Sequence, residues 1–215
     1  MRVLKELKQI VILLVFEYLC ILKIKSLSIA EKAMMPTLVT VIAAIYLFVS
    51  LIVLAPKKSG YSHIKHTISE IGESGAHNQR FVAFGLFLPI GISLLIVAYL
   101  INTASPAAAR LALCIAIGYI GAAVFPCDAG APLYGSVSHT LHFFAGAVEY
   151  IGGAFAMMTL AESLGEPFET AGYIVIGVAI ALSFPHPIRG LIQRIAELCL
   201  FGSLALAAWQ VGGAM

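Results

Sequence analysis

Charged side chains are scarce in this sequence, since Asp, Glu, Lys and Arg together make up only 11% of its 215 residues. A soluble globular domain carries about 25% charged residues, so water is not the main solvent of this chain. The net charge of +2 is also small, and no basic stripe with interleaved aromatic residues is present. The sequence therefore lacks the electrostatic features of a nucleic-acid-binding protein.

Cysteine is equally sparse, and its placement does not suggest disulfides. Of the four cysteines, Cys20, Cys114 and Cys199 fall within apolar runs and only Cys127 lies in a predicted loop. No disulfide framework is indicated, which excludes the small disulfide-stapled secreted domains.

Apolar residues are abundant instead, at 60% of the chain, with a mean hydropathy of +0.98. About 20 apolar residues in a helix cross a hydrocarbon core roughly 30 Å thick. The sequence predicts an all-α, polytopic transmembrane helical bundle with six core helices and an extra N-terminal helix, seven in total. The predicted spans are residues 9–24, 34–54, 81–102, 108–126, 139–162, 170–184 and 190–211.

The first run is ambiguous because it contains Glu17 and is closed by Lys23 and Lys25. It is either a transmembrane helix or an interfacial amphipathic segment, and Met34 and Met35 also allow residues 1–33 to be an upstream extension of the coding sequence. We therefore divide the chain into an N-terminal segment, 1–33, and a six-helix core, 34–215.

The loop charges favour seven spans with the N-terminus in the cytoplasm, because Lys and Arg are enriched in short cytoplasmic loops. That topology places nine of the 13 basic residues on the cytoplasmic side. Either helix count puts the loops at 55–80, 127–138 and 184–190 on one membrane face. These loops, or the first helical turn after them, contain all six histidines: His63, His66, His77, His139, His142 and His186.

The first of these loops contains Thr67-Ile-Ser-Glu70, which matches a capping box. The match predicts that Thr67 and Glu70 begin a short helix that ends at Gly72 or Gly75. The alternative is that Glu70 faces a pocket as an acid or base, with Ser69 beside it as a second catalytic candidate.

The second loop contains Phe125-Pro-Cys-Asp-Ala-Gly-Ala-Pro132, and Ser138-His-Thr-Leu-His142 begins the next helix. The prolines and Gly130 predict a turn. His139 and His142 lie three residues apart and therefore share a helix face, and Glu149 lies seven residues beyond His142 on the same face. An acidic residue at that depth in a membrane helix indicates the bundle interior or a water-filled cavity.

Two imidazoles and a carboxylate can bind zinc or another divalent metal and leave a fourth position for water. We therefore consider a metal site made of His139, His142 and Asp128, with Asp128, Glu70 and Ser69 as catalytic candidates. The adjacent carboxylate of Asp128 would raise the pKa of the Cys127 thiol, which disfavours a reactive thiolate. The other candidates on the polar face are His66, Cys127, Glu149 and His186.

The TISE-G, FPCD-G and SHTLH motifs resemble those of the uncharacterised multi-pass membrane proteins known as domain of unknown function 998. The resemblance covers about residues 37–210. It implies a six-helix core in the cytoplasmic membrane of a bacterium or archaeon, but no reaction.

Three functions remain open at this point. The first is a metal-dependent hydrolase that acts on a lipid-like substrate at the polar face. The second is a small transporter or proton-path protein, in which His142, Glu149 and Glu197 form an ionisable path through the bundle. A third hypothesis is a non-catalytic assembly or accessory protein whose polar loops lock the bundle together. Clustering of the histidines on one face disfavours haem-based electron transfer. Membrane lipids are the expected partners, and the sequence indicates no oligomeric state.

Overall fold

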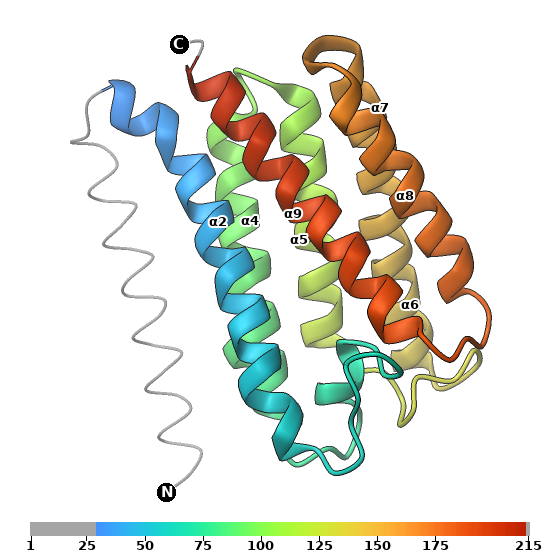
Figure 1. The fold of residues 1–215 in the computed structure, drawn as a ribbon. Helices are drawn as coiled ribbons and strands as arrows, with labels where there is room; N and C mark the ends of the chain where they lie inside the picture. The colour runs from blue at the N-terminus through green and yellow to red at the C-terminus, as the bar shows by residue number, and fades with distance from the viewer. Residues whose placement is uncertain (1–28, 214–215) are drawn as a thin grey trace, which may run out of the picture.

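The computed structural model describes residues 29–213, which fold as a bundle of helices with no β-strand in that range (Figure 1). Within residues 29–213, five helical segments are long and apolar enough to cross a membrane: Ala33–Lys57, Gln79–Ile101, Pro106–Val124, Val137–Leu164 and Arg189–Gly213. A sixth helix, α8 (Glu166–Leu182), has 17 residues and packs against α7 (Gly153–Leu164) and α9 (Arg189–Gly213). The chain is a multi-pass membrane protein.

Two of the long segments change helix type along their length. The segment at 79–101 consists of α3 (Gln79–Phe81), the π-helical turn η3 (Val82–Phe87) and α4 (Leu88–Ile101). The segment at 137–164 consists of α6 (Val137–Ala147), the π-helical turn η4 (Val148–Gly152) and α7. Such π-helical turns inside α-helices occur frequently at functional sites. The remaining elements are α2 (Ile29–Leu54), α5 (Pro106–Val124) and the short 3-10 turns η1 (Ala55–Lys57) and η2 (Ser69–Gly72).

The long helices alternate in direction, so that alternate connections meet at each end of the bundle (Figure 1). The connections at 58–78, 125–136 and 183–188 gather at one end, which we call the loop end. The short α4–α5 and α7–α8 connections lie at the other end, together with the end of α9.

Small residues on α5 allow the helices around it to approach closely. A side chain added at Gly121 would overlap the methyl group of Ala145 on α6, and one added at Gly118 would overlap the carboxyl group of Glu149. Close packing of this kind is the main source of helix association in lipid, where there is no hydrophobic driving force between helices.

Hydrogen bonds from α9 hold the first loop on the bundle. Arg194 donates to the carbonyl oxygen of His63 at 2.8 Å and to the Tyr61 hydroxyl at 2.6 Å. The backbone amide of Ile68 donates to Gln193 Oε1 at 2.8 Å. Because loop backbone needs hydrogen-bond partners wherever protein or lipid excludes water, these contacts fix the path of the loop.

The second loop contacts both of the others. Its Cys127 carbonyl accepts from the Ser74 amide at 2.8 Å, and its Gly130 amide donates to Glu73 Oε2 at 2.8 Å. Arg189, which follows the third loop, donates to the Ala131 carbonyl at 3.0 Å. The prediction that the three loops meet at one end of the bundle is therefore confirmed.

The predicted spans agree with the described helices to within a few residues, although α2 begins at Ile29, ahead of the proposed domain boundary at 33/34. Six long helices are present in residues 29–213. The predicted helix at 9–24 lies outside the described residues, so the count of seven stays a prediction.

We expect Gly190→Ala to destabilise the protein, because a Cβ at this position would meet the carbonyl oxygens of His66 and His63. Overpacking of this kind costs about 1–3 kcal/mol. Thermal unfolding in detergent should show a transition several degrees below that of the unmodified protein. Gly202→Ala is the matched control on the same helix, since a Cβ there meets no atom within 4 Å. Equal transitions for the two variants would contradict the docking of the loop on α9.

Candidate functional site

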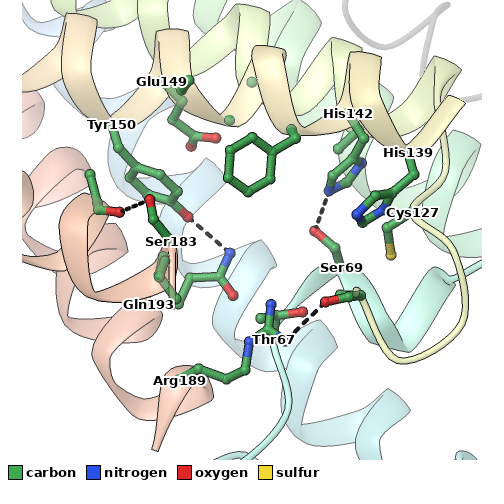
Figure 2. A pocket seen from close by; sticks show the side chains of 18 of the residues that line it. Thr67, Ser69, Cys127, His139, His142, Glu149, Tyr150, Ser183, Arg189 and Gln193 are labelled. Atoms are coloured by element: carbon green, nitrogen blue, oxygen red, sulfur yellow. Dashed lines mark hydrogen bonds between the residues drawn. The ribbon is translucent and has the colours of Figure 1, made fainter. Parts of the chain in front are cut away.

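A cavity of about 160 Å³ lies among α5, α6 and α8, directly beneath the loop end. Apolar side chains form part of its wall, among them Phe143 on α6, which is 47% exposed. Figure 2 shows the polar residues that line it, which are Thr67, Ser69, Cys127, His139, His142, Glu149, Tyr150, Ser183, Arg189 and Gln193.

Ser69 and His142 form a hydrogen-bonded pair on the cavity wall (Figure 2). The Ser69 hydroxyl lies 3.0 Å from His142 Nε2, and the other ring nitrogen, Nδ1, lies 2.9 Å from the Phe125 carbonyl oxygen. A carbonyl oxygen only accepts hydrogen bonds, so Nδ1 carries a proton, and in the neutral form of the ring Nε2 presents a lone pair to Ser69. His142 is thereby oriented to accept the proton of Ser69.

The sequence explains why the Phe125 carbonyl is available. Pro126 disfavours the helical conformation at the residue before it, and Phe125 accordingly leaves the helix with φ −118° and ψ 87°. The next helix, α6, is capped by Ser136, whose hydroxyl accepts from the His139 amide at 3.2 Å, and this cap sets the start of the helix that carries His142.

A buried polar network continues from the cavity toward the centre of the bundle. Gln193 donates to the Tyr150 hydroxyl at 2.9 Å, and Tyr150 donates in turn to Glu197 Oε1 at 2.7 Å. Tyr119 donates to the other carboxyl oxygen of Glu197 at 2.8 Å. Glu197 is therefore fully engaged.

Two polar atoms on the cavity wall are buried and lack a hydrogen-bond partner among the described residues: Oε1 of Glu149 and Nε of Arg189. Glu149 lies on the π-helical turn η4 and is 6% exposed. A buried polar atom without a partner costs about 1–3 kcal/mol, and more if it is charged. A bound ligand would relieve that cost.

Residues 41–210 match a family model described as a protein of unknown function, DUF998. The chain belongs to the DUF998 family. Searches of curated proteins and of solved structures each returned no match. The resemblance predicted from the sequence motifs is therefore confirmed, and the chemistry of this DUF998 chain has to be inferred from its own site.

The metal site predicted from His139, His142 and Asp128 does not assemble in this DUF998 structure. The two imidazole rings are parallel with centroids 6.5 Å apart, and their nitrogens point to separate partners. His139 Nδ1 accepts from the Asp128 amide at 3.2 Å, and its Nε2 lies 2.6 Å from the Pro132 carbonyl. Within residues 29–213, no three His, Cys, Asp or Glu side chains are grouped so that they could hold a metal ion.

Asp128 has a structural role in the second loop. Its carboxylate accepts from the Ser136 amide at 2.6 Å and from the Ser136 hydroxyl at 2.8 Å. These two hydrogen bonds lower the pKa of Asp128, and the side chain does not line the cavity. Asp128 therefore holds the cap of α6 and stands apart from the Ser69–His142 pair.

Glu70 also lies outside the cavity wall, and its carboxylate accepts from the Thr67 amide at 2.8 Å and the Thr67 hydroxyl at 3.0 Å. Glu70 reaches back to the Thr67 amide and the turn ends at Gly72, as the capping box predicts. The turn begins at Ser69, however, with Ile68, not Thr67, at its N-cap. The threonine hydroxyl also departs from the prediction by donating to the carboxylate, and the turn is of the 3-10 type.

The two remaining histidine candidates lie away from the cavity. His66 stacks on Tyr61 with ring centroids 5.5 Å apart and accepts from the Ser62 amide, so it belongs to the docked first loop. His186 is exposed in the third loop and accepts from the Ile188 amide.

Arg189, Tyr150 and Gln193 were not predicted as cavity residues from the sequence. The pattern Arg189, Gln193, Glu197 recurs every four residues, which places these polar side chains on one face of an apolar helix. This four-residue spacing is the sequence pattern that could have predicted a polar face on α9.

The Cys127 thiol should resist alkylation in the folded protein. Burial, followed by the nearby Glu73 and Glu70 carboxylates, raises its pKa to about 12, which confirms the predicted direction but not the predicted cause. At pH 8 roughly one molecule in 10,000 carries a thiolate. Mass spectrometry after iodoacetamide treatment should find Cys127 unmodified in the folded protein and modified after denaturation. Rapid modification under folding conditions would contradict the burial.

Proposed function

We propose that this protein is a membrane esterase or acyltransferase in which Ser69 attacks the ester carbonyl of a lipid-like substrate and His142 acts as the base. The observation that carries the proposal is the 3.0 Å contact between the Ser69 hydroxyl and His142 Nε2, with Nδ1 held by the Phe125 carbonyl. A nucleophile, a base and a group that orients the base are the components of a catalytic serine site. The hydrolase hypothesis is retained, with a serine nucleophile in place of the metal.

The proposed reaction has two steps, acylation of Ser69 and transfer of the acyl group to water or an alcohol. As Ser69 Oγ bonds to the carbonyl carbon, its proton moves to His142 Nε2. Collapse of the tetrahedral intermediate breaks the carbon–oxygen bond of the ester, and His142 returns the proton to the departing alkoxide. Water or a second alcohol then attacks the acyl-serine, giving its proton to His142, which passes it to Ser69 Oγ as the acyl group leaves.

Arg189 would assist by stabilising negative charge. Its NH1 is anchored by the Ala131 carbonyl, whereas its buried Nε has no acceptor among the described residues. A guanidinium held in place before the reaction stabilises the developing oxyanion more than the neutral carbonyl.

A lipid-like substrate suits the surroundings of the pair. Apolar residues of α6 and α8 form much of the cavity wall, and one of them, Phe143, is 47% exposed. An acyl chain could therefore pass from the bilayer to Ser69 without crossing water.

We further propose that the loop end faces the cytoplasm and that the protein resides in the cytoplasmic membrane. Among residues 33–213, the loop end carries Lys57, Lys58, Lys65, Arg80, Arg189 and Arg194, and the other end carries Arg110. This distribution agrees with the positive-inside rule. A helix at 9–24 would bring the number of spans to seven and place the N-terminus on the same side.

We expect a fluorophosphonate probe, which reacts with activated serines, to label the purified protein at Ser69. Ser69→Ala should abolish labelling, and His142→Ala should slow it by at least about 100-fold because the base is lost. The readout is gel fluorescence, with the site identified by mass spectrometry.

Ser183→Ala is the matched control, because Ser183 lines the same cavity but donates to the Ala179 carbonyl. Its labelling should equal that of the unmodified protein. An unlabelled protein, or labelling that survives Ser69→Ala, would refute the proposed nucleophile.

A further inference from the structure

Glu149 is the one buried carboxylate on the cavity wall within the described residues whose Oε1 has no hydrogen-bond partner. It is 6% exposed and belongs to η4, and Figure 2 shows it on the same helical segment as His142 and beside Tyr150. Ionisable side chains inside a membrane bundle are costly and usually serve binding or transport.

The carboxyl group of Glu149 packs closely against α5 at Gly118. Gly118 on α5 leaves the space that the carboxyl group occupies, since a Cβ at 118 would overlap Oε2. The π-helical turn brings Glu149 and the neighbouring Tyr150 to the cavity wall together.

Three polar side chains near Glu149 direct a hydrogen bond to other groups. The Tyr150 and Tyr119 hydroxyls both donate to Glu197, and the Gln193 amide donates to Tyr150. A molecule in the cavity would supply the missing partner of Glu149 Oε1.

We propose that Glu149 recognises a hydroxyl group on the acyl chain of the substrate. A hydroxyl can donate to a carboxylate and can also accept from a carboxylic acid, so it matches Glu149 in either protonation state. This inference rests on the proposed function for the position of the ester at Ser69, but the binding site at Glu149 does not depend on catalysis.

The helix sets the axial separation between the backbone positions of His142, which binds Ser69, and Glu149. Glu149 follows His142 by seven residues, which corresponds to about 10 Å along the helix axis at 1.5 Å per residue. The hydroxyl should therefore lie near the far end of a medium-length chain, as in 10-hydroxydecanoate. A hydroxyl close to the ester, as in 3-hydroxydecanoate, would not reach Glu149.

The direct test measures binding of three methyl esters to Ser69→Ala protein in nanodiscs, where hydrolysis is blocked. Methyl 10-hydroxydecanoate should bind about tenfold more tightly than methyl decanoate, and methyl 3-hydroxydecanoate should bind no better than methyl decanoate. The added substitution Glu149→Leu should remove the preference, whereas Glu149→Gln, which keeps a hydrogen-bonding amide, should retain part of it.

The outcomes separate this inference from the proposed function. Equal binding of the decanoate and 10-hydroxydecanoate esters, or a preference that persists in the Glu149→Leu background, would overturn the role of Glu149 even if Ser69 is labelled by fluorophosphonate. A preference that depends on Glu149, together with unlabelled Ser69, would support the hydroxyl site and refute the esterase. Retained fluorophosphonate labelling of Ser69 in the single Glu149→Leu variant would show that this substitution leaves the fold intact.

Discussion

The hydrogen bond from the Ile68 amide to Gln193 is the contact on which the site depends. Gln193 is buried on α9 and also donates to Tyr150 in the middle of the bundle, so a single side chain links the first loop to the helical core. Ser69 follows Ile68 directly and therefore takes its position from this link. A loop at the membrane boundary has to satisfy its backbone groups, and here the same hydrogen bond places the candidate nucleophile beside His142.

The site also requires two departures from regular α-helix. Pro126 ends α5 so that the Phe125 carbonyl can hold His142, and the π-helical turn η4 brings Glu149 and Tyr150 to the cavity. Glycine at 118 makes room for the Glu149 carboxyl group. A bundle of regular helices with larger side chains on α5 would close this space.

Hydropathy and helical period were enough to predict the helices and the gathering of three loops, because both follow from bilayer thickness and from the parity of the spans. The shared face of His142 and Glu149 was also predictable, and both residues line one cavity. The partners of the histidine nitrogens were not predictable. They include the Phe125 and Pro132 carbonyls, and a backbone carbonyl leaves no mark in the residue pattern. For the same reason, two histidines three residues apart suggested a metal, whereas each ring has its own partners. Ser69 was named as a candidate on its motif alone, and its pairing with His142, 73 residues away, required the fold.

The protonation pattern of His142 tests the central claim most directly. Nitrogen NMR of the protein with labelled histidine, assigned by comparison with His142→Ala, distinguishes a protonated ring nitrogen from one with a free lone pair. We predict a proton on Nδ1 and a lone pair on Nε2, and the Nε2 resonance should move when Ser69 is replaced by alanine. A proton on Nε2 with a free lone pair on Nδ1 would contradict the account, because His142 could then not accept the proton of Ser69.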